Sequence, residues 1–313
     1  MKIVQTNPFT SVNYIGIDIS KDTLDIHGIP KFNQVPNTAA GHRKIISHTP
    51  EGSRIVFEAT GGYEKALWLT LLEAGITVSR INPSRIRDLA KSVGQIAKTD
   101  KIDAKMIAFY GEKLTPRADV LPSEHQRKLE SLVQAREQLI SSRAMQTIQI
   151  KQHTDKEILK IFTQVNANLL KQIKKLDTRI AQQLGSAEHK DQARRLQQIS
   201  GVGPITTATL LAFMPELGQM SGNQAAALVG VAPHNDDSAK SNKKRHIRGG
   251  RSRVRKVLYM SATTAIRFNP ILKALYLNLI SKGKAHKVAI VAVMRKLIIL
   301  LNRLLKDENF KLA

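Results

Sequence analysis

The stretch YIGIDIS, residues 14–20, decides the fold of the first third of the chain. Its apolar residues alternate with Gly16 and Asp18, and Thr23–Ile29 follows after a short break. This period of two predicts a buried strand that turns into a β-hairpin. An aspartate in the middle of a buried strand must be hydrogen-bonded, paired or bound to a metal. Asp18 is therefore either a cap of the following turn or a functional carboxylate, and the strand alone leaves both open.

Strands and helices alternate after this hairpin. Further strands are expected at Phe32–Val35, Arg54–Phe57 and Ile76–Ile81. Helices are expected at Ala39–His48, Tyr63–Ala74, Ser84–Val93 and Thr99–Glu112. Three strands in hairpin order, followed by strands that alternate with helices, predict an α/β domain of the RNase H type over residues 12–115.

The charge of the chain indicates a polyanionic partner. The 313 residues include 49 Lys and Arg against 25 Asp and Glu, a formal net charge of +24. Such an excess favours nucleic acid, while an aromatic content of 4% argues against binding by base stacking on many rings. The absence of cysteine excludes disulfides, Cys-ligated zinc and thiol chemistry. The start lacks the apolar core of a signal peptide, and Val288–Leu301 is too short and too charged to span a bilayer, so a soluble, cytoplasmic protein is expected.

A long helical segment follows a predicted linker at Pro116–Pro122. Between Ser123 and Leu184 the chain has neither Pro nor Gly, and apolar residues recur at spacings of three and four. These features predict two long amphipathic helices over residues 122–185 that hinge around Lys151–Lys156. Such helices form either a coiled-coil arm that joins two subunits or part of a bundle within one subunit. The narrow apolar stripe favours the arm.

Residues 194–306 predict an all-α domain. Its first part, LQQISGVGPITTATLLAF over residues 196–213, has the form of a helix-hairpin-helix motif. Gly201 and Gly203 would let the backbone approach a phosphate, which suits the amides at the start of the second helix. A plain turn between two packed helices produces the same pattern. Further helices are expected at Asn223–Val229, Arg251–Phe268, Ile271–Ser281 and Ala285–Leu305.

Three more carboxylates stand in settings that match Asp18. Glu58 ends a predicted strand, and Asp100 and Asp103 share one face of the first turn of a predicted helix. In an RNase H-like sheet these positions converge on one edge, where four carboxylates would hold two divalent ions about 4 Å apart. Oxygen ligands without cysteine indicate Mg²⁺. For Asp100 and Asp103 alone, pairing with neighbouring lysines is the alternative.

These motifs resemble the insertion-sequence-110 family of transposases and the related pilin-gene invertases. The resemblance is carried by YIGID ending at Asp18, FEATGGY around Glu58 and KTDKIDA around Asp100 and Asp103, then by ISGVGPIT, LVGVAPHNDDS and RGGRSRVR. It covers residues 14–305, with the motifs in the same order. It implies a RuvC-like Asp-Glu-Asp-Asp domain, a C-terminal transposase domain and DNA as the substrate. It further implies a structured bridge RNA as guide and a homo-oligomer, dimer or tetramer.

The resemblance also singles out a serine. In the family, a serine in an Asn-x-Asp-Ser-Gly motif completes the site and attacks the DNA phosphate, and residues 235–239 here read NDDSA. By composition alone, Ser238 would be a turn or cap residue. Ala239 stands where the family often has glycine, and alanine reaches positive φ only at a cost. Ser241 therefore stays a second candidate for the nucleophile.

A run of basic residues surrounds this serine. Nine Lys or Arg occur between Ala239 and Lys256 without one acid, and they would repel each other unless a polyanion were present. A solvated charged surface is the alternative. Together with Gly201 and Gly203, the expected nucleic-acid-binding residues are Lys240, Lys243, Lys244, Arg245, Arg248, Arg251, Arg253, Arg255 and Lys256.

The sequence thus predicts a DNA transposase or recombinase that works through Mg²⁺-bound carboxylates and a covalent phosphoserine link. A RuvC-like Holliday-junction nuclease that uses water is the first alternative, since the carboxylates suit both. A non-catalytic nucleic-acid-binding protein is the second. It would explain the charge but would leave Asp18 without a role.

Overall fold

The chain folds into two compact units, Met1–Leu121 and Pro122–Ala313. The computed structural model describes residues 12–94, 100–233, 237–238, 241–242 and 246–310. Each unit has a hydrophobic core of its own. Within the described ranges, no helix is both long and apolar enough to cross a membrane.

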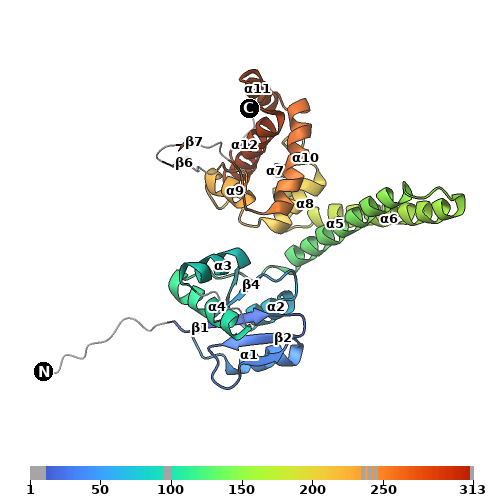
Figure 1. Cartoon of the computed structure of the whole chain (residues 1–313). Helices are drawn as coiled ribbons and strands as arrows, with labels where there is room; N and C mark the ends of the chain where they lie inside the picture. Colours follow the sequence, from blue (N-terminus) through green and yellow to red (C-terminus); the bar gives the residue numbers. More distant parts are fainter. Residues whose placement is uncertain (1–11, 95–99, 234–236, 239–240, 243–245, 311–313) are drawn as a thin grey trace. The chain divides into compact units, whose positions relative to one another are not determined.

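The first unit is built on a mixed sheet of five strands in the order β3-β2-β1-β4-β5 (Figure 1). β1, β2 and β3 are antiparallel neighbours, whereas β4 runs parallel to both β1 and β5. This order confirms the predicted RNase H-like arrangement. The strands are β1 (Tyr14–Ile19), β2 (Thr23–His27), β3 (Gln34–Pro36), β4 (Arg54–Glu58) and β5 (Thr77–Ile81).

The alternation in β1 separates the two faces of the sheet. Ile15, Ile17 and Ile19 are at most 5% exposed and share a core with side chains of α1 and α2. Gly16 and Asp18 therefore point to the opposite face, where side chains of α3 and α4 pack. The four helices are α1 (Ala39–His48), α2 (Lys65–Glu73), α3 (Pro83–Ser92) and α4 (Asp100–Leu114).

Several element boundaries differ from the prediction by one or two residues, and two of these differences have a visible structural reason. β3 begins at Gln34 and not at Phe32, because the Phe32 ring instead packs edge-on against His48 of α1. α2 begins at Lys65 and not at Tyr63, because the preceding turn is held by the Glu64 carboxylate, which accepts a 2.8 Å hydrogen bond from the Gly62 amide.

Gly16 lets α4 lie directly on β1. A Cβ atom at Gly16 would overlap the carbonyl oxygen of Ala104 and stand 2.5 Å from the backbone nitrogen of Ala108. Further along the helix, a Cβ atom at Gly111 would stand 2.5 Å from the ring of Tyr14. As α4 advances from Ala104 to Gly111, its contacts move back along β1. The helix is therefore antiparallel to β1, and its first turn lies at the carboxyl end of that strand.

The predicted linker is held against the last strand by Asp119. The Asp119 amide donates to the Val78 carbonyl oxygen at 2.7 Å. Its carboxylate accepts from the Trp68 indole at 2.8 Å and from the Arg80 guanidinium at 2.9 Å. The Arg80 guanidinium also lies 3.6 Å over the Trp68 ring. The segment is thus an ordered extension of the first unit.

The second unit begins with two long helices, α5 (Glu124–Ile150) and α6 (Lys156–Leu184), which pair in antiparallel fashion (Figure 1). At their base, Leu129 of α5 and Ile180 of α6 are fully buried in the core of the unit. At their tip, Ile148 and Ile161 are 62% and 60% exposed. The base of this helical pair is thus part of the folded core, whereas its tip projects from it.

α8 lies in the middle of the remaining helices and is buried from Thr206 through Ala212. Between α9 and α10 the chain forms a two-stranded ribbon, β6 (Asp237–Ser238) with β7 (Ser241–Asn242), which the all-α prediction did not include. The helices are α7 (Lys190–Leu196), α8 (Pro204–Phe213), α9 (Gly222–Val229), α10 (Ser252–Phe268), α11 (Pro270–Ser281) and α12 (His286–Lys306).

Candidate functional site

Asp18 and Glu58 lie on neighbouring strands at the same edge of the sheet. β1 and β4 pair in parallel with Ile17 opposite Phe57, so the next residues on the two strands, Asp18 and Glu58, stand level with each other. Because Ile17 and Phe57 face the core shared with α1 and α2, both carboxylates face the side of α4. Both side chains are partly exposed, and the Ile19 amide donates to the Asp18 carboxylate at 3.0 Å.

α4 brings one more described carboxylate, that of Asp103, to this edge. Ala104 of α4 lies over Gly16, two residues before the carboxylate of β1, and Asp103 directly precedes Ala104. The Asp103 side chain is half-buried. Asp100 is the first residue of α4, and its side chain lies outside the described part of the structure. The structure therefore brings Asp18, Glu58 and Asp103 to one face and one edge of the sheet.

Asp25 is a carboxylate that the sequence analysis missed. It stands opposite Asp18 in the β1–β2 register and is only 5% exposed. Its carboxylate accepts a 2.9 Å hydrogen bond from the Gln34 side chain. The expectation that Asp18 is the buried carboxylate is therefore wrong, because Asp18 is partly exposed and the buried one lies on the next strand. Like charges directly opposite each other repel, so a cation at this edge would offset the repulsion.

A hydrogen-bond network centred on Asn37 holds the loops that follow β1 and β4. The Asn37 side-chain amide donates to the carbonyl oxygen of Ser20 at 2.9 Å and to that of Tyr63 at 3.3 Å. Its side-chain oxygen is bonded to Nε2 of His42 at 2.9 Å. His42 is 3% exposed, and this burial lowers its pKa. The network ties together the two loops that border the carboxylates, and no sequence motif indicates it.

The donors at this edge suit a hard divalent cation. Asp18, Glu58 and Asp103 offer carboxylate oxygens, which Mg²⁺ prefers. Among the side chains that the structure describes, no three His, Cys, Asp or Glu close into a metal cluster, and the side chain of Asp100 is not one of these. By donor type these oxygens suit a divalent ion, whereas Asp18, Glu58 and Asp103 by themselves do not form a closed metal site.

The predicted nucleophile lies in the ribbon of the second unit. The backbones of β6 and β7 pair with Ser238 opposite Ser241 and Asp237 opposite Asn242. Ala239 lies outside the described residues, as do the side chains of both serines. The two candidate serines are thus direct neighbours across the ribbon.

Arginines of the predicted phosphate-binding run make contacts within the second unit. Arg251 forms a bidentate ion pair with Glu216, at 2.8 and 2.7 Å, and Arg253 pairs with Glu137 of α5 at 2.6 Å. Arg255 donates to two backbone carbonyl oxygens, at 3.0 and 2.5 Å. These arginines stabilise the fold, a role the sequence analysis did not consider.

The rest of the basic run divides into two groups. Arg248 and Lys256 are exposed. The residues of the run that lie outside the described part of the chain are Lys240, Lys243, Lys244 and Arg245.

The two glycines of the predicted helix-hairpin-helix motif have different surroundings. Gly201 has a φ of +102°, and a Cβ atom there would stand 2.7 Å from the Ser261 carbonyl oxygen of α10. Gly203 faces open space directly before Pro204, the first residue of α8. Gly201 therefore permits close packing of two segments, as in the alternative interpretation of this motif. Of the two, Gly203 is the one open to a phosphate.

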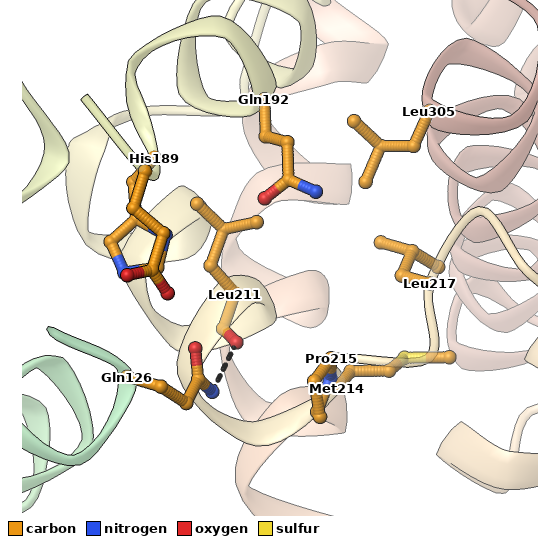
Figure 2. Close-up of a pocket in the computed structure, with 9 residues that line it drawn as sticks. Gln126, His189, Gln192, Leu211, Met214, Pro215, Leu217 and Leu305 are labelled. Atoms are coloured by element: carbon orange, nitrogen blue, oxygen red, sulfur yellow. Dashed lines mark hydrogen bonds between the residues drawn. The ribbon is translucent and has the colours of Figure 1, made fainter. Parts of the chain in front are cut away.

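A cavity of about 220 Å³ lies at the base of the paired helices (Figure 2). Its lining includes Gln126 of α5, Gln192 of α7 and His189, the residue directly before α7. Gln126 donates to the Leu211 carbonyl oxygen at 2.8 Å. His189 is 3% exposed, and neither of its ring nitrogens has a hydrogen-bond partner among the described residues. Burial lowers the pKa of His189, while the Glu188 carboxylate raises it. Ordered water in the cavity would satisfy this imidazole.

Comparison with known proteins identifies the class. Residues 15–158 match the profile of a DEDD transposase, and residues 193–277 match that of the transposase IS116/IS110/IS902 family. The pilin gene-inverting proteins of Moraxella bovis and Moraxella lacunata are each 30% identical to this chain, over 92% of its length and 94% of theirs. The transposase for insertion sequence element IS1111A of Coxiella burnetii is 22% identical, over 72% of this chain and 70% of its own.

The RNase H-like sheet with carboxylates at one edge, taken with these matches, defines a transposase, an enzyme of phosphoryl transfer. The chain belongs to the IS110 family of transposases, with an N-terminal DEDD domain and the C-terminal domain of that family. The resemblance read from the sequence motifs is confirmed.

Lowering the pH from 7.5 to 5.5 should destabilise the protein through its two buried histidines. Burial lowers the pKa of His42 and of His189 in the folded state below the ordinary value of 6.5. As the pH falls below 6.5, these two histidines take up protons in the unfolded chain before they do so in the folded protein. The free energy of unfolding therefore falls below pH 6.5 and keeps its full value above it. Urea unfolding at the two pH values measures the loss.

The variants His42→Gln and His189→Gln should each lose less stability on acidification than the wild type. The exposed His27 provides a matched control, and His27→Gln should behave as the wild type. An equal loss in all three variants would show that the buried histidines are not responsible.

Proposed function

We propose that this chain cuts and rejoins DNA strands with carboxylates of the first unit and a serine of the second. The observation that carries the proposal is the convergence of Asp18, Glu58 and Asp103 on one edge of the sheet in a transposase of this family. With Asp100, these side chains would hold two Mg²⁺ ions. Such ions stabilise negative charge on a phosphodiester and make an attacking hydroxyl more nucleophilic.

Ser238 supplies the attacking hydroxyl in this proposal. Its Oγ loses a proton and bonds to phosphorus as the bond from phosphorus to a deoxyribose oxygen breaks, and the departing oxygen takes up a proton. The phosphoserine link conserves the phosphodiester energy, so a deoxyribose hydroxyl of another strand can displace Oγ and rejoin the DNA without ATP. The place of Ser238 in the motif NDDSA supports this choice, and Ser241 is the second candidate.

The partners beyond DNA are proposed from the family resemblance. A structured bridge RNA would guide the reaction, recognised by its shape and backbone because only 4% of the residues are aromatic. The relatives from Moraxella are named for inversion of a pilin gene, and we propose strand exchange of this kind for the present chain.

A second copy of the chain is proposed to cover the tip of the paired helices. Large apolar side chains are between 39% and 62% exposed there, at Met145, Ile148, Ile158, Ile161 and Val165. Apolar surface gathered in this way is typical of a protein interface. The predicted arm over residues 122–185 would then join subunits through its tip.

The Holliday-junction nuclease remains the competing function, because the same carboxylates could activate water. The two functions differ in the nucleophile alone, so the covalent intermediate separates them.

Removing any one carboxylate should abolish cleavage and leave DNA binding intact. The variants Asp18→Ala, Glu58→Ala, Asp100→Ala and Asp103→Ala should each cut more than about 100-fold more slowly, because each loses a ligand of the divalent ions. Glu51 is an exposed carboxylate away from this edge, and Glu51→Ala should cut at the wild-type rate. Cleavage rates on labelled DNA and anisotropy of the bound DNA are measured together. Full cleavage by the Asp100 and Asp103 variants would refute the four-carboxylate site.

The covalent intermediate should be trapped on a DNA substrate nicked near the cleavage site. Wild-type protein should form an adduct with the DNA that survives boiling in detergent, and Ser238→Ala should form none. The carboxylate variants should also fail, because the serine depends on their metals. Cleavage without an adduct would mean that water attacks, and would favour the nuclease. An adduct in Ser238→Ala that is lost in Ser241→Ala would move the nucleophile to Ser241.

Polar substitutions at the tip should weaken assembly without unfolding the chain. The double variant Ile148→Asn and Ile161→Asn should have a lower mass by light scattering than the wild type at equal concentration. Phe268 of α10 is 68% exposed, so Phe268→Asn is a control of similar exposure that should keep the wild-type mass. An unchanged mass in the double variant would exclude the tip as the subunit interface.

A further inference from the structure

The outer face of α6 carries a row of cations that the proposed chemistry does not use. At 3.6 residues per turn these cations point away from Ile173 and Ile180, which are buried on the opposite side of the helix. All of them are exposed. This basic stripe consists of Lys160, Lys171, Lys174, Lys175 and Arg179.

The charge of the basic stripe is not compensated within the described part of the chain. None of its members takes part in an ion pair among the described residues. α6 has two acids, Glu157 in its first turn and Asp177, which pairs with Arg136 of α5. Lys171 and Lys175 are four residues apart on the same face, and like charges at this spacing destabilise a helix. A polyanion along this face would remove the repulsion.

Two arginines at the start of α10 show the opposite behaviour. Arg251 and Arg253, which the sequence marks as phosphate binders, are paired with Glu216 and Glu137. Their charge is therefore used inside the fold. The cations of the basic stripe on α6, in contrast, direct their charge to solvent.

We propose that the basic stripe binds the phosphate backbones of a nucleic-acid duplex. Between Lys171 and Arg179 the cations recur about every 6 Å along the helix, so several can follow one backbone. Lys160 lies about 16 Å from Lys171, which is enough to reach the other backbone across a groove about 12 Å wide. Contacts of this kind position a duplex without reading its sequence.

This surface is separate from the apolar tip. Ile158, Ile161 and Val165 lie about a quarter turn around α6 from the centre of the basic stripe. A second copy on the tip would therefore leave Lys171, Lys174, Lys175 and Arg179 accessible. The inference rests on the proposed function in so far as a nucleic acid is the substrate, and it adds the surface that holds the duplex.

The test is duplex binding by the full chain in EDTA, where cleavage plays no part. The stripe variant combines Lys160→Gln, Lys171→Gln, Lys174→Gln and Lys175→Gln. Against a 30-base-pair duplex, the magnitude of the slope of log K against log salt should fall by about 3.6, because each of the four lost phosphate contacts contributes about 0.9. Affinity at 100 mM salt should fall at least about 10-fold.

Two controls separate the stripe from net charge. Arginine at the same four positions should restore affinity and salt slope. A scattered variant removes four exposed cations elsewhere, through Lys31→Gln, Arg43→Gln, Lys282→Gln and Lys306→Gln. It should change the slope by less than about 1. Equal effects of the stripe and scattered variants would overturn the inference.

The same titrations with a DNA and an RNA duplex of one sequence distinguish the source of the backbone. A loss on one duplex alone identifies that duplex as the ligand, and a loss on both shows that the shared phosphate backbones are recognised. A loss on neither overturns the inference. DNA cleavage in Mg²⁺ is measured in a separate experiment. A stripe variant that binds duplex as the wild type does then counts against the inference, whereas a wild type that does not cleave counts against the proposed function.

Discussion

The backbone of α4 rests on the Cα atom of Gly16, and the position of the carboxylates depends on this contact. The carbonyl oxygen of Ala104 occupies the space that a side chain at Gly16 would need. The first turn of α4 is thereby placed at the carboxyl end of β1, next to Asp18 and Glu58. In the motif YIGID the glycine supplies the geometry, and the aspartate is one of the proposed metal ligands. A side chain at residue 16 would lift the helix and carry Asp103 away.

The large positive charge of the chain serves more than one purpose. At the start of α10, Arg251 and Arg253 are paired with Glu216, in the turn after α8, and with Glu137 of α5, and they stabilise the second unit. On α6, lysines form an exposed row on a helix that contributes its opposite face to the core. A net charge of +24 therefore indicates a polyanionic partner without showing which cations contact it. The distinction comes from the structure, which shows which cations are paired with acids of the protein and which are exposed to solvent.

Much of the first unit follows from the sequence because its signals are local. The period of two in YIGIDIS and the turns at Asn82-Pro83 and Gly61-Gly62 mark strands and helices to within about two residues. The same pattern indicates the face of Asp18 and Glu58. It does not place Asp25 opposite Asp18, because that pairing depends on the strand register and not only on the alternation.

Other features could not be predicted because they depend on contacts far apart in the chain. Arg253 pairs with Glu137, which is 116 residues away in the sequence. The sequence around Arg253 therefore shows a run of cations without a visible acidic partner. Gly201 in a tight turn looks like a phosphate-binding glycine until α10 is seen to lie against it. His189 stands in a polar stretch that resembles surface, and its burial results from helices that pack around it.

The most direct measurement of the central claim is the effect of Mg²⁺ on the thermal unfolding of the full chain. Ligands that bind the folded state raise its stability, by about 2.7 kcal/mol at a concentration 100 times the dissociation constant. We expect Mg²⁺ to raise the unfolding temperature of the wild type and of Glu51→Gln equally, and to raise that of Asp18→Asn much less. An equal rise in Asp18→Asn, or no rise in the wild type, would contradict a divalent-ion site built on Asp18.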